Sequence, residues 1–158
     1  MKKYDRIKAV EYARKWALDR NPKFYDFSKI GGDCTNYISQ CLYAGCSAMN
    51  YSKINGWYYK NLNDRSASWT SVKYLQKFLL TNSKEGPIAS IRPISKLEIG
   101  DIIQFKQPHQ DFSHTLFVSK KLGDKIYVCA HSRDVLDAPF SIYFYERAVG
   151  IHILGVNV

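Results

Sequence analysis

The chain has 158 residues, a net charge of +9 and 46% hydrophobic side chains. This length indicates one domain over residues 1–158, which can bury about 70% of its unfolded surface without disulfides. The composition excludes a disordered chain. No apolar run approaches the length of a membrane span, so we expect no membrane contact.

The positive charge concentrates near the N-terminus, where residues 1–30 hold nine Lys/Arg against four Asp/Glu, a local charge of +5. Such a surface suits an anionic partner, for which an acidic carrier protein, an anionic polymer and nucleic acid are the candidates. A soluble basic surface without a partner is the alternative. Nucleic acid is disfavoured, because the basic and tyrosine residues are dispersed and no helix-turn-helix or RNP-like pattern occurs.

The first residues carry charges throughout. No apolar core follows Lys2 and Lys3, and no cleavage site follows them. This pattern favours the cytoplasm, where the four cysteines would stay reduced.

Apolar residues at helical spacing predict a first helix over 7–17, which Asn21-Pro22 ends. A second helix is expected over 34–45, because Tyr37, Ile38 and Cys41 recur at the same spacing. Asp33 is expected to cap it, with its side chain accepting from backbone N–H groups one turn in.

Cys34 is the first residue of this second helix, directly after Gly31-Gly32-Asp33. The positive end of the helix dipole favours a thiolate there, and the glycines leave space for a group to approach the sulfur. The alternative is an ordinary buried cysteine that opens a core helix.

Residues 46–67 predict a long, aromatic, ordered loop, and Ser68 is expected to cap a helix carrying Val72, Leu75, Phe78 and Leu79. A loop over 82–93 follows. The remaining elements are expected to be strands, over 101–105, 115–120, 125–130, 149–156 and near 141–145. Helices first and strands second predict an α+β fold in which N-terminal helices pack on a C-terminal antiparallel sheet.

Two histidines flank the hairpin that Gly123-Asp124 predicts: His114 before its first strand and His131 at the end of its second. A cysteine at a helix start, a histidine on one strand and a polar residue on the next supply a nucleophile, a base and an orienting group. His109, in a loop, is the fallback base. His152 lies between apolar residues and is expected to be a core or surface histidine.

Five segments together resemble the bacterial putative amidase domain family of the papain-like superfamily, which also holds NlpC-type and CHAP cell-wall hydrolases. They are GGDCTNYISQCLYAG, SWTSVKYLQKFL, LEIGDIIQF, FSHTLFV and AHSRD, within residues 9–134. The resemblance implies a papain-like/NlpC-like core. It also implies Cys34 as nucleophile, His114 as base and His131 as the third polar group, with Asp134 as the alternative.

This site would form a thioester at Cys34 from an amide or peptide substrate. Transfer to water makes an amidase or peptidase, and transfer from a carrier-protein thioester to an amine makes an amide-forming acyltransferase. A non-enzymatic, basic nucleic-acid-binding module is the third alternative. The backbone N–H of Cys34, with Asp33 beside it, is the expected oxyanion donor, since Ser28 and Lys29 stand where papain carries its glutamine.

Three aromatic residues are expected to contact the substrate: Trp57, Tyr58 and Trp69. We expect no cofactor and no metal, because the cysteine spacings C-x6-C and C-x4-C lack the C-x2-C of structural zinc sites. Cys41 and Cys129 are expected in the core.

Overall fold

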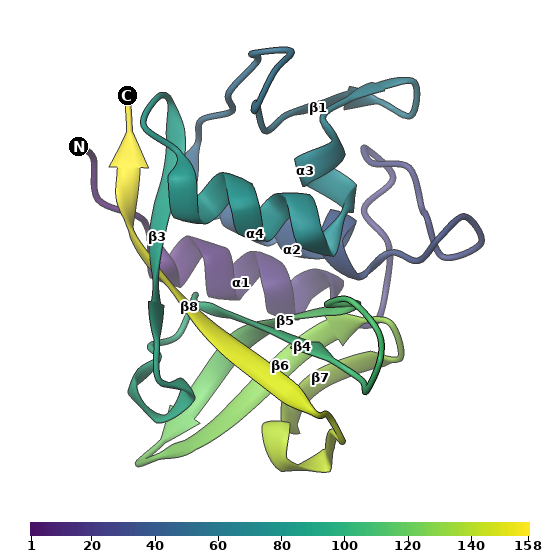
Figure 1. The fold of residues 1–158 in the computed structure, drawn as a ribbon, viewed down its shortest axis with the longest axis vertical. Coiled ribbons are helices and arrows are strands. Elements are labelled where there is room, and N and C mark those ends of the chain that lie inside the picture. Colours follow the sequence, from purple (N-terminus) through teal and green to yellow (C-terminus); the bar gives the residue numbers. More distant parts are fainter.

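The structure, a computed structural model, describes residues 1–158 and places a layer of helices on one face of an antiparallel sheet (Figure 1). The helices are α1 (Arg6–Trp16), α2 (Cys34–Cys46), α3 (Ala67–Thr70) and α4 (Val72–Thr81), with 3-10 turns η1 (Ile94–Lys96) and η2 (Phe140–Ile142). The strands are β1 (Tyr59–Asn61), β2 (Asp64–Arg65), β3 (Gly86–Arg92), β4 (Ile102–Lys106), β5 (His114–Leu122), β6 (Lys125–His131), β7 (Asp134–Pro139) and β8 (Arg147–Asn157). The large sheet has the order β3-β8-β4-β5-β6-β7, and all its neighbouring strands are antiparallel, which confirms the α+β class.

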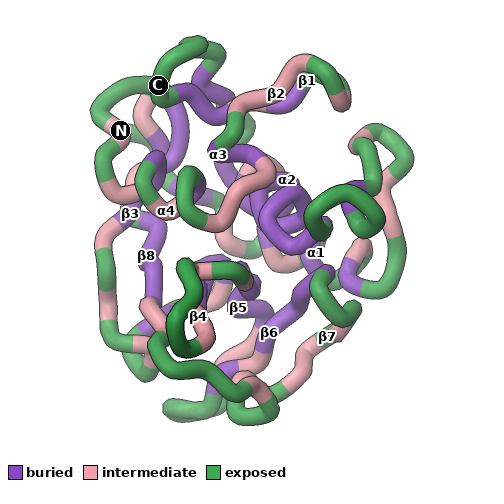
Figure 2. Tube along the Cα trace, turned by 45° about the vertical axis from the view of Figure 1, so that its right-hand side comes forward, coloured by how far each residue is buried: buried purple, intermediate pink, exposed green.

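The core lies between the helix layer and the sheet. Tyr37, Ile38 and Leu42 of α2 are fully buried there, against Phe117 of β5 and Ile151 of β8. Figure 2 shows α2 and the middle strands as the most continuously buried parts of the chain. The helix stripe anticipated from the sequence therefore faces the sheet and fixes where α2 begins relative to β5 and β6.

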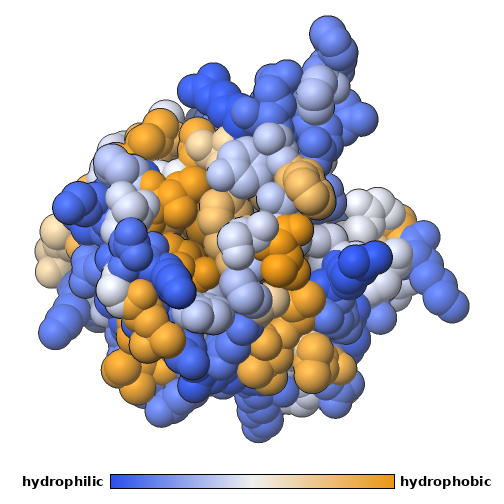
Figure 3. Space-filling view, turned by 90° about the horizontal axis from the view of Figure 1, so that it is seen from below, coloured by the Kyte–Doolittle hydropathy of each residue, from blue (hydrophilic) through white to orange (hydrophobic).

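The opposite face of the sheet carries a second, smaller apolar cluster. It contains Phe105, Leu116 and Val118, and the segments around η1 and η2 cover it. Apolar side chains remain exposed among polar ones on this side of the molecule (Figure 3). A hollow of about 650 Å³ lies here between η1, β6 and η2, and Ile126 and Phe140 are among its walls.

Four expected strands are confirmed as β4, β5, β6 and β8, with ends displaced by at most two residues. The strand expected near 141–145 is wrong, because η2 and an irregular segment occupy it, while β7 forms upstream over Asp134–Pro139. Residues 86–92 were expected in a loop but form β3. Gly86-Pro87 is typical of a turn, but β3 lies at the edge of the sheet, where a strand tolerates proline.

The helix expected after Ser68 is instead two helices. Ser66 precedes the short α3, and Ser71 caps α4 by accepting from the backbone N–H of Tyr74 at 3.3 Å. The expected loop over 46–67 contains the small β1–β2 hairpin. No helix has both the length and the apolar character that a membrane crossing requires.

Candidate active site

A cavity of about 300 Å³ opens at the N-terminus of α2. It brings together most of the expected site residues, and most of its lining side chains are polar. The lining consists of Arg20, Ser28, Gly31, Gly32, Asp33, Cys34, Ser113, His114, His131, Ser132 and Asp134. Segments from the α1–α2 connection, α2, β5, β6 and β7 thus meet at one edge of the helix–sheet interface.

Cys34 is the first residue of α2 and keeps 9% of its surface exposed. The backbone N–H groups of Cys34, Thr35 and Asn36 have no hydrogen-bond partner within the chain. Unpaired N–H groups at a helix start attract negative charge. The arrangement therefore leaves backbone donors available beside the Cys34 side chain, where they can stabilise an oxyanion.

Two glycines shape the approach to Cys34. Gly31 and Gly32 have φ angles of 80° and 99°, in the left-handed region that favours glycine. A Cβ built at either position would have no atom within 4 Å, so the space in front of the loop is open.

Asp33 does not cap α2 with its side chain as expected. Its Oδ1 accepts from the backbone N–H of Phe27 and from Nδ2 of Asn36, both at 2.9 Å, and its Oδ2 lies 2.7 Å from His131 Nδ1. The carboxylate is 1% exposed and also lies 3.5 Å from the guanidinium of Arg20. The Asp33 carboxylate therefore joins the α1–α2 connection to the first turn of α2 and to His131. A carboxylate only accepts, so the backbone N–H of Asp33 is the group that stays a predicted oxyanion donor.

His131 is a buried residue of the cavity wall and makes no hydrogen bond to His114. Its Nδ1 bonds Asp33, its Nε2 lies 2.6 Å from the carbonyl oxygen of Trp16, and its ring stacks on Tyr37 at 3.8 Å. Both ring nitrogens therefore have partners, and neither is left to orient His114. The structure thus departs from the expectation that His131 fixes the tautomer of His114.

Asp134 is also paired elsewhere. It accepts two hydrogen bonds from Arg20, at 2.8 Å and 3.1 Å. Arg20 in addition contacts Asp26 at 3.3 Å and donates to Ser28 at 3.1 Å. This guanidinium ties the α1–α2 connection to β7, and Asp134 makes no hydrogen bond to His114.

His114, the first residue of β5, lies on the wall of the cavity. Side chains alternate along a strand, so His114 shares the face of Leu116 and Val118, and its ring stacks on Phe105 at 4.7 Å. No hydrogen bond joins it to Cys34 or to any other side chain. Burial lowers the pKa of His114 below its ordinary value of 6.5, so the imidazole is neutral at pH 7.

The other two histidines lie outside the cavity. His109 is exposed in the β4–β5 loop with φ 61°. His152 is buried, with Nδ1 2.8 Å from Asp101, whose carboxylate also binds Arg6 at 2.8 Å. His152 is therefore a satisfied core histidine, one of the two roles expected for it.

The structure places the aromatic residues expected at the substrate elsewhere. Trp57 and Trp69 are fully buried, with ring centroids 4.8 Å apart, and donate their indole N–H groups to Ser39 and Asn36. This placement corrects the expectation that they bind substrate, because apolar rings and paired N–H groups settle in the core. Tyr58 donates to Asp64 at 2.9 Å and does not line the cavity.

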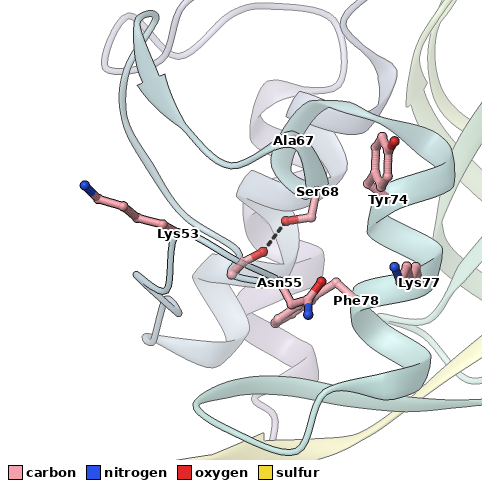
Figure 4. Close-up of a pocket in the computed structure, with 8 residues that line it drawn as sticks. Lys53, Asn55, Ala67, Ser68, Tyr74, Lys77 and Phe78 are labelled. Atoms are coloured by element: carbon pink, nitrogen blue, oxygen red, sulfur yellow. Dashed lines mark hydrogen bonds between the residues drawn. The ribbon is translucent and has the colours of Figure 1, made fainter.

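A different hollow, of about 200 Å³, lies between the 53–56 turn and helices α3 and α4 (Figure 4). Ser68 donates to the carbonyl oxygen of Gly56 at 2.6 Å and holds the turn against α3. Lys53 and Lys77 supply its charged groups, and neither cysteine nor histidine lines it. The 53–56 turn therefore packs on α3 and α4 and does not line the cavity at Cys34.

The three remaining cysteines are free and fully buried. Burial raises the pKa of each, to about 12 for Cys46. The core positions expected for Cys41 and Cys129 are confirmed. No cluster of three or more His, Cys, Asp or Glu side chains is arranged to hold a metal ion.

Sequence reasoning missed three residues around Cys34: Arg20, Thr35 and Thr115. Thr35 and Thr115 follow Cys34 and His114 directly in the sequence, and their hydroxyls meet at 3.1 Å. Adjacency to the two candidate catalytic residues was the available signal, whereas nothing in its neighbourhood marked Arg20.

Comparison with known proteins gives one family and two relatives. The family model described as Putative amidase domain matches residues 3–154. The Bacillus subtilis (strain 168) protein named Uncharacterized protein YhbB is 38% identical over 136 residues, which cover 83% of this chain and 42% of that protein. Uncharacterized protein YjcM of the same strain is 26% identical over 147 residues, covering 88% of this chain and 33% of that protein.

The chain thus spans less than half the length of these two relatives. No solved structure matches it. Because the family model covers nearly the whole chain, the chain belongs to the putative amidase domain family.

Proposed function

We propose that this chain is a papain-like cysteine amidase or peptidase in which Cys34 is the nucleophile. One observation carries the proposal: Cys34 stands at the unpaired N-terminus of α2 and opens into a polar cavity. Three N–H groups without partners stabilise a thiolate and, during reaction, an oxyanion. Membership of the amidase family supplies the bond class.

In this mechanism the base takes the proton of the Cys34 thiol, the sulfur attacks the carbonyl carbon of an amide, and the carbonyl electron pair moves onto oxygen. The oxyanion then accepts hydrogen bonds from backbone N–H groups at the start of α2. Collapse breaks the C–N bond, and the amine leaves with a proton from the base. Water attacks the resulting thioester, gives up a proton to the base, and releases the acid and the Cys34 thiol.

His114 is the base we assign. Of the two histidines on the cavity wall, His131 has both nitrogens engaged, whereas the ring nitrogens of His114 are uncommitted. Its lowered pKa makes it neutral and able to take a proton at pH 7. His114 stacks on Phe105, on the sheet face away from α2, so in this mechanism its ring turns toward the sulfur when substrate binds. Catalytic hydrogen bonds are often completed only in the substrate complex.

Hydrolysis is favoured over transfer to an amine. Transfer to an amine requires that water be kept away from the Cys34 thioester, and the tyrosine-rich segment over 51–59 is the candidate for doing so. That segment does not line the cavity, and open space lies in front of Gly31 and Gly32. Water can therefore reach the Cys34 thioester from this side.

The test uses a panel of acyl 4-nitroanilides and short peptide amides, with intact mass spectrometry to find an acyl adduct. We expect the native chain to release amine and Cys34→Ala to release none. We expect His114→Gln to lose most of the activity, whereas His109→Gln, a change at an exposed histidine, retains it. Full activity in Cys34→Ala would refute the proposal, and loss in His109→Gln alone would move the base to His109.

A further inference from the structure

A chain of buried polar side chains leads from the sheet to the sulfur of Cys34. Thr35 Oγ1 lies 3.7 Å from Cys34 Sγ and 3.1 Å from Thr115 Oγ1. Gln104 Nε2 donates to Thr115 Oγ1 at 3.2 Å. Thr35, Thr115 and Gln104 are each at most 1% exposed, so none of these groups can turn to bulk water for a partner.

The amide of Gln104 sets the direction of this chain. Its Nε2 also donates to the carbonyl oxygen of Val72 at 3.1 Å, and its Oε1 accepts from Nε2 of Gln76 at 3.0 Å. The carbonyl oxygen of Val72 only accepts, so the amide nitrogen must face it, and the amide cannot be reversed. Both hydrogens of Nε2 are thereby assigned, one to Val72 and one to Thr115.

Each hydroxyl carries a single hydrogen, so the remaining directions follow. Thr115 Oγ1 accepts from Gln104 and makes its only other contact with Thr35, to which it must donate. Thr35 Oγ1 then accepts from Thr115, and the Cys34 sulfur is the only remaining partner for its own hydrogen. All donors are paired when Thr35 donates to sulfur, and a thiolate is a stronger acceptor than a thiol.

We propose that the Thr35 hydroxyl donates a hydrogen bond to Sγ of Cys34 and stabilises the thiolate, with Gln104 orienting it through Thr115. Thr35 is then a further catalytic residue, because it touches the reacting sulfur. Thr115 and Gln104 are positioning residues. The inference rests on the proposed role of Cys34 as nucleophile.

The experiment measures the rate of Cys34 alkylation by iodoacetamide between pH 5 and 9, with the modified cysteine identified by peptide mass. No substrate is needed, so this result is independent of whether amides are hydrolysed. For Thr35→Val, which keeps the side-chain shape, we expect the alkylation rate at pH 6 to fall about tenfold, the effect of losing one donor to a charged acceptor. Thr35→Ser keeps the hydroxyl and is expected to follow the native profile.

Thr115→Val removes the group that orients Thr35 and is expected to lower the rate about threefold, since Thr35 can still donate but is no longer held. A native profile in Thr35→Val would overturn the proposal. An equal fall in Thr35→Ser and Thr35→Val would overturn it too, because the cause would then be packing. A native profile in Thr115→Val would overturn the orienting role of Gln104 and Thr115. Melting temperatures recorded beside each profile identify any variant that is unfolded. If Thr35→Val is unfolded, alkylation is measured instead in Thr35→Ala, which also lacks the hydroxyl.

Discussion

The pairing of His131 with Asp33 can be tested by replacing His131 with Ala. The variant leaves the buried Asp33 carboxylate without its 2.7 Å contact and the Trp16 carbonyl without its 2.6 Å contact, and it removes the ring stacked on Tyr37. Loss of a hydrogen bond to a charged group costs about 1.5–3 kcal/mol, and an orphaned carbonyl about 1 kcal/mol more. The lost ring contact adds about 0.5–1.5 kcal/mol.

The sum is about 3–5.5 kcal/mol, close to the range of about 3–5 kcal/mol measured when one partner of a buried pair is removed. Asp33 keeps the backbone N–H of Phe27, Asn36 and the nearby Arg20 guanidinium, which argues for the lower half of this range. Small domains have total stabilities of about 5–15 kcal/mol, so the loss is readily measured.

The assay is urea unfolding followed by tryptophan fluorescence, with linear extrapolation to water. Lys106→Ala is the matched control, since it breaks a 3.0 Å ion pair with the half-exposed Glu146 and should cost less than about 1 kcal/mol. A cost for His131→Ala as small as that of the control would refute the reasoning. It would mean that His131 is not committed to Asp33 and is free for the orienting role inferred from the sequence.

Three further outcomes follow from the site. Iodoacetamide at pH 7 is expected to label Cys34 first, because burial raises the pKa of the other thiols and leaves Cys46, with a pKa of about 12, only about 10⁻⁵ ionised; faster labelling of any other cysteine in peptide maps would contradict this. The hydrolysis rate should decline as pH falls through the pKa of His114, which burial lowers below its ordinary value of 6.5, because the neutral base is lost there; a decline centred above pH 7 in a pH–rate profile would point to another group. Gly32→Ala places a Cβ in open space at φ 99°, so backbone strain alone should lower the free energy of unfolding by about 1–2 kcal/mol. An unchanged melting temperature would contradict this and show that the loop relaxes.

The sequence alone identified the elements that carry the candidate residues. The spacing of Tyr37, Ile38 and Cys41 placed Cys34 at the start of a helix, and Gly123-Asp124 placed the β5–β6 hairpin. Such patterns are local, because the period of apolar residues records which face of one element is buried. They therefore gave the α+β class and four strands of the sheet.

Local patterns failed where pairing between distant segments decides the outcome. Gly86-Pro87 is typical of a loop, yet these two residues begin β3. They can do so because β3 pairs with β8 at the edge of the sheet, where proline is tolerated. Trp57 and Trp69 have large apolar rings with one polar N–H, a type found both at binding sites and in cores, and in the structure both are fully buried.

Only the tertiary structure decided the partners of the site residues. His131 meets Asp33 and Trp16 across 98 and 115 positions of the sequence, and these contacts, not its place on the hairpin, determine what it can do. Thr35 meets Thr115 for the same reason, since packing α2 on β5 brings two buried hydroxyls together. The local sequence determines the type of a side chain and the element that carries it. Its hydrogen-bond partner depends on which buried surfaces come together, which is decided only when the whole core packs.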